Sequence, residues 1–133
     1  MSDTQTSQVE RYFELMTASD IAGIVSLFAD DGYVMSPFLG RMMAADFFPK
    51  LGGASTASLL TVHDILLGRN GDSAAARFRY DWTLADGSDL SFEGVDYFTF
   101  APDGKFQSML IYYDTHPLRL EVGDKYATAQ PTS

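Results

Sequence analysis

One carboxyl group stands where the sequence pattern expects an apolar side chain. Alternation along the predicted strand Leu90–Phe100 places Asp96 on the face whose other members are Phe92, Gly94, Phe98 and Phe100. A carboxylate on such a face is costly unless it is paired, hydrogen-bonded or held protonated. Three interpretations stay open: a structural partner such as an arginine or a backbone N–H, exposure near the strand end, or a ligand pocket in which Gly94 leaves room.

Two further residues are candidates for chemistry beside Asp96. Tyr12 lies on the apolar stripe of a predicted helix, and its hydroxyl with a protonated Asp96 would form a pair of hydrogen-bond donors for a developing oxyanion. His63 is the candidate base, because histidine titrates near neutrality without a special environment. A lone histidine in a strand also fits a structural or exposed position.

Helical periodicity comes first along the chain. Apolar residues at helical spacing predict two amphipathic helices, with the stripes Val9, Tyr12, Phe13, Met16 and then Ile21, Ile24, Val25, Phe28. Ser19 or Asp20 is the expected N-cap of the second helix. The Asp30-Asp31-Gly32 break leads into a short strand, Tyr33–Ser36, and a third helix fits Arg41 to about Phe48, where Pro49 ends or bends it.

The second half of the chain follows a period of two. It predicts strands over Leu59–Leu67, Ala74–Leu84, Leu90–Phe100 and Phe106–Tyr113, separated by turns at 69–72, 85–88 and 102–105. Within Ala74–Leu84 the aromatic residues Phe78, Tyr80 and Trp82 point one way, and Arg77, Arg79 and Asp81 point the other. Helices followed by a meander of long antiparallel strands predict an α+β domain.

The bulk composition argues against several classes of function. With 133 residues the chain forms one domain, and its net charge of −9 disfavours nucleic acid and anionic membrane surfaces as partners. The absence of cysteine excludes disulfides, thiol nucleophiles and thiolate metal sites. No apolar run is long enough to cross a bilayer and no signal peptide is evident, so a cytoplasmic protein is expected. Isolated histidines and scattered carboxylates lack metal-ligand spacing, so neither metal nor cofactor is expected.

The segments 11–15, 20–31 and 36–38, and later Val95-Asp96 and 104–109, together resemble bacterial ketosteroid isomerases. The segment ending in Phe28-Ala29-Asp30-Asp31 is shared with the wider SnoaL-like superfamily. This resemblance implies an α+β, cone-shaped, nuclear-transport-factor-2-like fold in which three N-terminal helices pack on a curved, mostly antiparallel sheet. One such domain is expected over residues 7–126, with flexible ends at 1–6 and 127–133.

Carried over residue by residue, the resemblance implies half of an active site. Tyr12 matches the oxyanion-hole tyrosine of the isomerases and Asp96 matches their protonated aspartic acid. Their general-base aspartate is replaced by Ser36, a poor base without an activating neighbour. Ile111 stands near the position from which SnoaL-type polyketide cyclases take an acid–base aspartate. The family register would turn His63 toward the pocket, together with Leu59, Thr61, Ile65 and Leu67, and make it the replacement base.

The rest of the pocket wall is expected to be mainly apolar. Its predicted members are Phe28, Ser36, Phe48, Phe78, Tyr80, Trp82, Phe92, Gly94, Met109, Ile111 and Tyr113, of which Phe28 and Phe48 match supporting tyrosines in an isomerase relative. The opposite sheet face, with Arg77, Arg79, Asp81 and Tyr97, is predicted to form a homodimer.

Two functions follow from this pocket. The first is an enzyme that isomerises, cyclises or dehydrates a small hydrophobic, steroid- or polyketide-like carbonyl compound, with Tyr12 and Asp96 stabilising an enolate and His63 moving the proton. The second is a non-catalytic ligand-binding or accessory domain that kept the pocket and lost the base at Ser36. A role in binding other proteins is a third alternative, because fold alone does not decide function.

Overall fold

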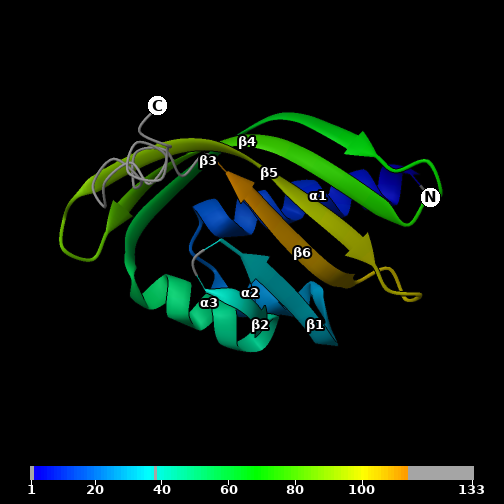
Figure 1. Ribbon diagram of the computed structural model, residues 1–133, viewed down its shortest axis with the longest axis horizontal. Coiled ribbons are helices and arrows are strands. Elements are labelled where there is room, and N and C mark those ends of the chain that lie inside the picture. Colours follow the sequence, from blue (N-terminus) through cyan, green and yellow to red (C-terminus); the bar gives the residue numbers. More distant parts are fainter. Residues whose placement is uncertain (1, 38, 114–133) are drawn as a thin grey trace, which may run out of the picture.

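A six-stranded sheet curves around three helices in the computed structural model, which describes residues 2–37 and 39–113 (Figure 1). The elements in chain order are α1 (Ser2–Thr17), α2 (Ile21–Ser26), β1 (Phe28–Ser36), β2 (Gly40–Met43), α3 (Ala44–Gly53), β3 (Ser55–Leu67), β4 (Ser73–Leu84), β5 (Asp89–Phe100) and β6 (Phe106–Tyr113). The strand order is β2-β1-β6-β5-β4-β3, in which only the β1–β6 pair is parallel. The α+β class and the curved, mostly antiparallel sheet are confirmed.

The first two helices bury the stripes that the sequence predicts. Val9, Tyr12, Phe13 and Met16 of α1 are each at most 5% exposed. The carboxylate of Asp20 accepts a hydrogen bond from the backbone N–H of Gly23 at 2.9 Å, so Asp20 is the N-cap of α2. Helix α1 begins at Ser2 and includes residues that were expected to fray, and the side chain of Gln5 donates to the carbonyl of Gly71.

The segment between α2 and β3 differs most from the prediction. Helix α2 ends at Ser26, and β1 begins at Phe28 and runs through Asp30-Asp31-Gly32 with an irregular register before Tyr33. Gly32 permits this bend, because a Cβ there would lie 2.9 Å from the carbonyl oxygen of Ala29. The third helix therefore follows the β1–β2 hairpin and does not complete an N-terminal set of three.

Helix α3 contains Pro49 and does not end at it. A proline inside a helix removes one backbone hydrogen bond and crowds the preceding turn. Burial of the neighbouring rings offsets this loss, since Phe47 is 4% exposed and Phe48 is fully buried. The predicted start at Arg41 is wrong, because residues 40–43 form the edge strand β2.

The long strands confirm the period-two pattern of the second half. In β4 the side chains of Phe78 and Tyr80 are buried on the concave face, while Arg77 and Arg79 are exposed on the outer face. Gly87 and Gly104 adopt φ values of +88° and +89° in the turns between strands, a conformation that favours glycine. The predicted domain boundary at 126, the flexible end at 127–133 and His116 lie outside the described residues.

Candidate functional site

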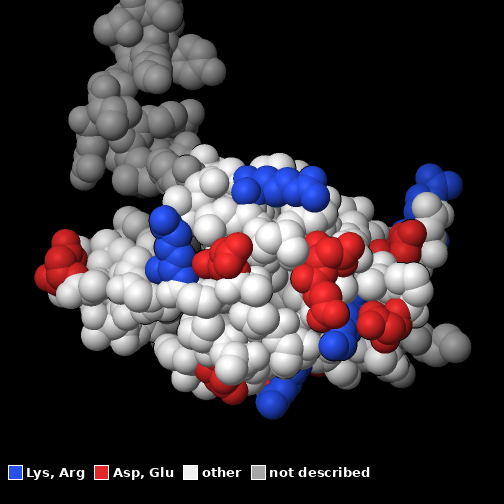
Figure 2. Space-filling model, turned by 90° about the horizontal axis from the view of Figure 1, so that it is seen from below, with Lys and Arg blue, Asp and Glu red and all other residues white. Residues whose placement is uncertain are grey.

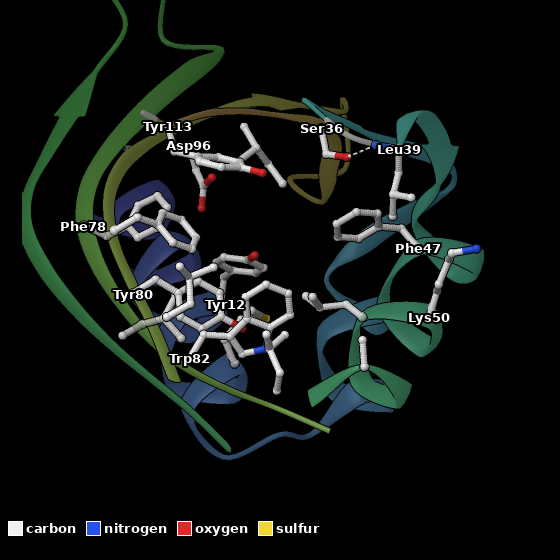
Figure 3. A pocket seen from close by; sticks show the side chains of 18 residues that line it. Tyr12, Ser36, Leu39, Phe47, Lys50, Phe78, Tyr80, Trp82, Asp96 and Tyr113 are labelled. Carbon is white, nitrogen blue, oxygen red and sulfur yellow. Dashed lines mark hydrogen bonds between the residues drawn. The ribbon is translucent and has the colours of Figure 1, made fainter. Parts of the chain in front are cut away.

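The concave face of the sheet and the helices enclose a cavity of about 490 Å³ that opens beside α3 (Figure 3). Small-molecule pockets typically measure roughly 300–1,000 Å³. The lining residues are Tyr12, Met16, Ser36, Leu39, Phe47, Lys50, Leu51, Ala54, Leu60, Phe78, Tyr80, Trp82, Leu84, Leu90, Phe92, Asp96, Ile111 and Tyr113. Nearly all of this wall is aromatic or aliphatic, so the space suits an apolar ligand.

Asp96 is the exception in this wall. It extends from β5 into the cavity, as Figure 3 shows, and is only 2% exposed. Its Oδ1 atom is buried and has no hydrogen-bond partner among the described residues. Burial without a compensating cation or donor raises the pKa of the Asp96 carboxyl well above its ordinary value. The structure therefore favours the neutral acid, which can donate a hydrogen bond.

Tyr12 lies on the same cavity from the α1 side. Edge-on ring contacts with Phe13 and Phe98, with centroids at 5.0 and 5.5 Å, fix its orientation. Burial raises the pKa of the Tyr12 hydroxyl well above its ordinary value, and the nearby charge of Asp96 raises it further. No hydrogen bond joins the two side chains, so both hydroxyl groups are available to a ligand.

The other polar groups of the sheet wall already have partners. The hydroxyl of Tyr80 shares a hydrogen bond of 2.8 Å with Ser58, and the indole N–H of Trp82 donates to Ser55 Oγ at 2.7 Å. Ser55 in turn donates to the carbonyl of Leu51 at 2.7 Å, which ties the sheet to the end of α3. These two aromatic residues present their ring surfaces to the cavity.

Ser36 lies across the cavity from Asp96, near the β1–β2 turn (Figure 3). Its Oγ accepts a hydrogen bond of 3.1 Å from the backbone N–H of Leu39. No basic side chain among the described residues is bonded to it, so nothing activates this hydroxyl as a proton acceptor. Ser36, at the position where the resemblance expects a general base, therefore stabilises the β1–β2 turn.

Most of the residues predicted for the pocket wall do line the cavity: Tyr12, Ser36, Phe78, Tyr80, Trp82, Phe92, Asp96, Ile111 and Tyr113. Four predicted wall residues do not. Phe28, Phe48 and Met109 belong to the core behind the cavity, at 3%, 0% and 0% exposure. Gly94 provides no space for a ligand, because a Cβ there would lie 2.7 Å from the carbonyl oxygen of Tyr112 and 3.0 Å from the Phe78 ring.

His63 does not face the cavity, and the predicted register of β3 is wrong over residues 59–63. Val62 pairs with Phe78 and Leu60 with Tyr80, so the even-numbered residues of this part of β3 face inward. A register shift between Val62 and Asp64 leaves the imidazole of His63 on the outer face, with Nε2 3.2 Å from the Glu93 carboxylate. Leu59 is likewise exposed, at 55%. Beyond the shift, Ile65 and Leu67 pair with the buried Ala76 and Ala74, so these two residues lie on the inner face as predicted.

Several wall residues were not predicted from the sequence. They are Met16, Leu39, Phe47, Lys50, Leu51, Ala54, Leu60, Leu84 and Leu90. Met16 follows Tyr12 by one helical turn, a spacing that could have indicated it. Those on α3 depended on a helix whose predicted start was three residues too early, and Leu60 depended on the register of β3.

Charges on the outside of the molecule are mixed. The view in Figure 2 shows acidic and basic side chains scattered over this face and no continuous basic surface. Within residues 2–37 and 39–113, no three histidine, aspartate or glutamate side chains form a group that could hold a metal ion. Helices in the same described part of the chain are too short or too polar to span a bilayer.

Comparisons with known proteins agree with the sequence resemblance. Residues 9–109 match the model of the SnoaL-like domain. Among solved structures, a protein of unknown function from Exiguobacterium sp. 255-15, described as NTF2-like, superposes with a TM-score of 0.70 at 22% identity, covering 80% of this chain and 98% of its own.

Two further solved structures belong to proteins whose descriptions name a ligand or a reaction. The epoxide hydrolase/cyclase-like enzyme SalBIII, described for pyran ring formation in the polyether salinomycin, gives a TM-score of 0.75 at 20% identity, covering 86% of this chain and 94% of its own. TerC, co-crystallised with polyporic acid, superposes with a TM-score of 0.73 at 19% identity, covering 88% of this chain and 96% of its own. At these identities the structural likeness establishes the NTF2-like fold alone.

Proposed function

Because this chain belongs to the SnoaL-like domain family, we propose that its cavity binds a small hydrophobic carbonyl compound of steroid- or polyketide-like character. One observation carries the proposal: the buried Asp96 side chain, whose Oδ1 has no hydrogen-bond partner among the described residues, lines a mainly apolar cavity of about 490 Å³. A buried polar group without a partner destabilises the fold, so its retention at Asp96 is explained by a ligand that satisfies it. The pyran-forming and polyporic-acid-binding relatives support an oxygenated cyclic ligand.

The ligand oxygen is placed between two donors in this proposal. The protonated carboxyl of Asp96 donates to the carbonyl oxygen, and the hydroxyl of Tyr12 donates to the same atom. Because the site is apolar, such hydrogen bonds are stronger than in water. Negative charge that develops on this oxygen during enolisation would be stabilised, which is the step common to isomerisation, cyclisation and dehydration of carbonyl compounds.

A non-catalytic ligand-binding domain is the second candidate, and a specific observation favours it. Enolisation also needs a base, and Asp96 is the only carboxyl group among the lining residues that the structure describes. His63 lies on the outer face and Ser36 is engaged with Leu39. Among the described residues, a catalytic version would therefore use Asp96 for both transfers, its O–H proton passing to the ketone oxygen while its other oxygen accepts the proton from carbon; alternatively, a base carried by the ligand accepts that proton.

The intrinsic fluorescence of Trp82 provides the test, because this cavity residue is the only tryptophan of the chain. We expect a fused-ring ketone to bind more tightly than the hydrocarbon with the same skeleton, by a factor of about 5–30, which corresponds to about 1–2 kcal/mol for a hydrogen bond from a buried donor. The substitution Asp96→Leu should reduce this preference to the part that the Tyr12 hydroxyl supplies, and leave hydrocarbon binding intact.

Tyr80→Phe is the matched control, since the Tyr80 hydroxyl is hydrogen-bonded to Ser58 and the proposal gives it no contact with the ligand oxygen. It should keep the preference for the ketone. Equal affinity of wild type for ketone and hydrocarbon, or an unchanged preference in Asp96→Leu, would refute the proposal.

Hydrogen exchange at the ligand separates the two candidate functions. In heavy water, an enzyme that forms an enolate exchanges the protons next to the ketone for deuterium, which NMR detects. Exchange in wild type that disappears in Asp96→Leu supports catalysis. Tight binding of the ketone without exchange supports a binding domain.

A further inference from the structure

A single cationic side chain lies on the wall of the cavity. Lys50, on α3, is the only lysine or arginine among the described lining residues, and it lies across the cavity from Asp96 with its nitrogen directed outward (Figure 3). Lysine covers apolar surface with its methylene chain while the ammonium group stays in water. The cavity thus has an acidic hydrogen-bond donor deep in the wall and a cation at its mouth.

The ammonium group of Lys50 has no ion-pair partner among the described residues, unlike several arginines elsewhere in the described part of the chain. Arg11, Arg77 and Arg79 each pair with a carboxylate, and the guanidinium of Arg41 stacks on the Tyr33 ring at 3.8 Å. Asp46 lies one turn earlier on α3 and is exposed, yet it forms no ion pair with Lys50. In a chain of net charge −9, an unpaired lysine at the mouth of the cavity is available to an anion.

We propose that the ligand is an amphipathic acid: an apolar body with a carbonyl oxygen toward Asp96 and an anionic group, such as a carboxylate, that reaches Lys50 at the mouth. This inference rests on the proposed function and narrows its substrate class. The aromatic surfaces of Tyr80 and Trp82 cover the body between the two ends. The acidic exterior of the protein would repel an anion elsewhere, so Lys50 also fixes which end of the ligand enters first.

The test compares a charged and a neutral form of one ligand: a fused-ring ketone with a carboxylate-bearing side chain, and its methyl ester, which differs by one methyl group and the charge. Binding is followed by Trp82 fluorescence at low and high salt. Wild type should bind the acid about two- to fivefold more tightly than the ester, the range of an ion pair at a partly exposed site. The preference should shrink at high ionic strength.

Lys50→Met should bind the acid and the ester with equal affinity, whereas Lys50→Arg should retain the preference for the acid. Lys105→Met is the matched control, because it removes the same charge from an exposed turn that does not line the cavity. If acid and ester bind wild type equally, or if Lys105→Met lowers the preference as much as Lys50→Met, the amphipathic-acid proposal fails while the ketone site stands. If neither ligand binds, the proposed function itself fails.

Discussion

Carboxyl groups on the two faces of the sheet have opposite surroundings. On strand β5, Glu93 extends from the outer face and Asp96 from the concave face. The Glu93 carboxylate is partly exposed and contacts both His63 and Arg77 at 3.2 Å. The Asp96 carboxyl is buried, and its Oδ1 has no hydrogen-bond partner among the described residues. Paired charges in water contribute little to stability, whereas a buried polar atom without a partner lowers it, and this difference is what a ligand at Asp96 would explain.

Replacement of Asp96 by leucine should change the free energy of unfolding more than replacement of Glu93 on the outer face. We expect Asp96→Leu to raise the free energy of unfolding by about 1–3 kcal/mol, because it removes an unsatisfied buried polar group and adds apolar contact beside an open cavity. Urea unfolding measures the change. Glu93→Gln on the outer face should change stability by less than about 1 kcal/mol, since its ion pairs are exposed. Destabilisation by Asp96→Leu would mean that the carboxyl group has a structural role.

The pH dependence of stability should separate the two carboxyl groups as well. Folding raises the pKa of Asp96, so in the window above the ordinary carboxyl pKa of about 3.9 the unfolded chain loses this proton while the folded chain keeps it. The free energy of unfolding should therefore fall as pH rises through this window, by about 1.4 kcal/mol per pH unit, until the folded carboxyl also ionises.

Asp96→Asn should lack this fall, so the difference in unfolding free energy between wild type and variant isolates it. Asp81 and Asp86, whose hydrogen bonds lower their pKa values, act in the opposite direction but are common to both proteins and cancel. Parallel curves for the two proteins above pH 4 would contradict a raised pKa at Asp96.

The outer face is also the surface that we expect to pair two copies of the chain. It carries the exposed apolar side chains of Tyr97, Tyr112 and Leu66, at 38%, 58% and 61% exposure, beside arginines and carboxylates of both signs. Tyr112→Lys should weaken a dimer about fivefold, roughly 1 kcal/mol, while Ala85→Lys, with the same added charge in an exposed turn, should not. Sedimentation equilibrium measures the change, and a monomeric wild type would overturn the dimer.

The sequence predicted the concave face better than the outer one, and the reason is physical. Buried positions repeat with the period of their element, so the Tyr12 stripe and the Phe78, Tyr80, Trp82 row were readable. Asp96 was recognised because a carboxyl group interrupts such a row. The β3 register was not readable, because a shift near His63 exchanges the two faces and leaves no mark in composition. The start of α3 was missed because residues 40–43 pair with β1, a contact between strands.

Replacement of His63 should have the smallest effect on stability, and it tests the register of β3 directly. We expect His63→Ala to change the free energy of unfolding by no more than about 0.5 kcal/mol, since an exposed pair with Glu93 is lost. Ketone affinity and any hydrogen exchange at the ligand should equal those of wild type, because the imidazole lies across the sheet from the cavity. A tenfold loss of exchange at unchanged stability would instead make His63 a participant in the chemistry. Asp96→Leu is the contrasting variant, because it should lower the preference for the ketone while stabilising the fold. Ligand binding and stability therefore change in opposite directions at Asp96, whereas His63→Ala leaves ligand binding unchanged.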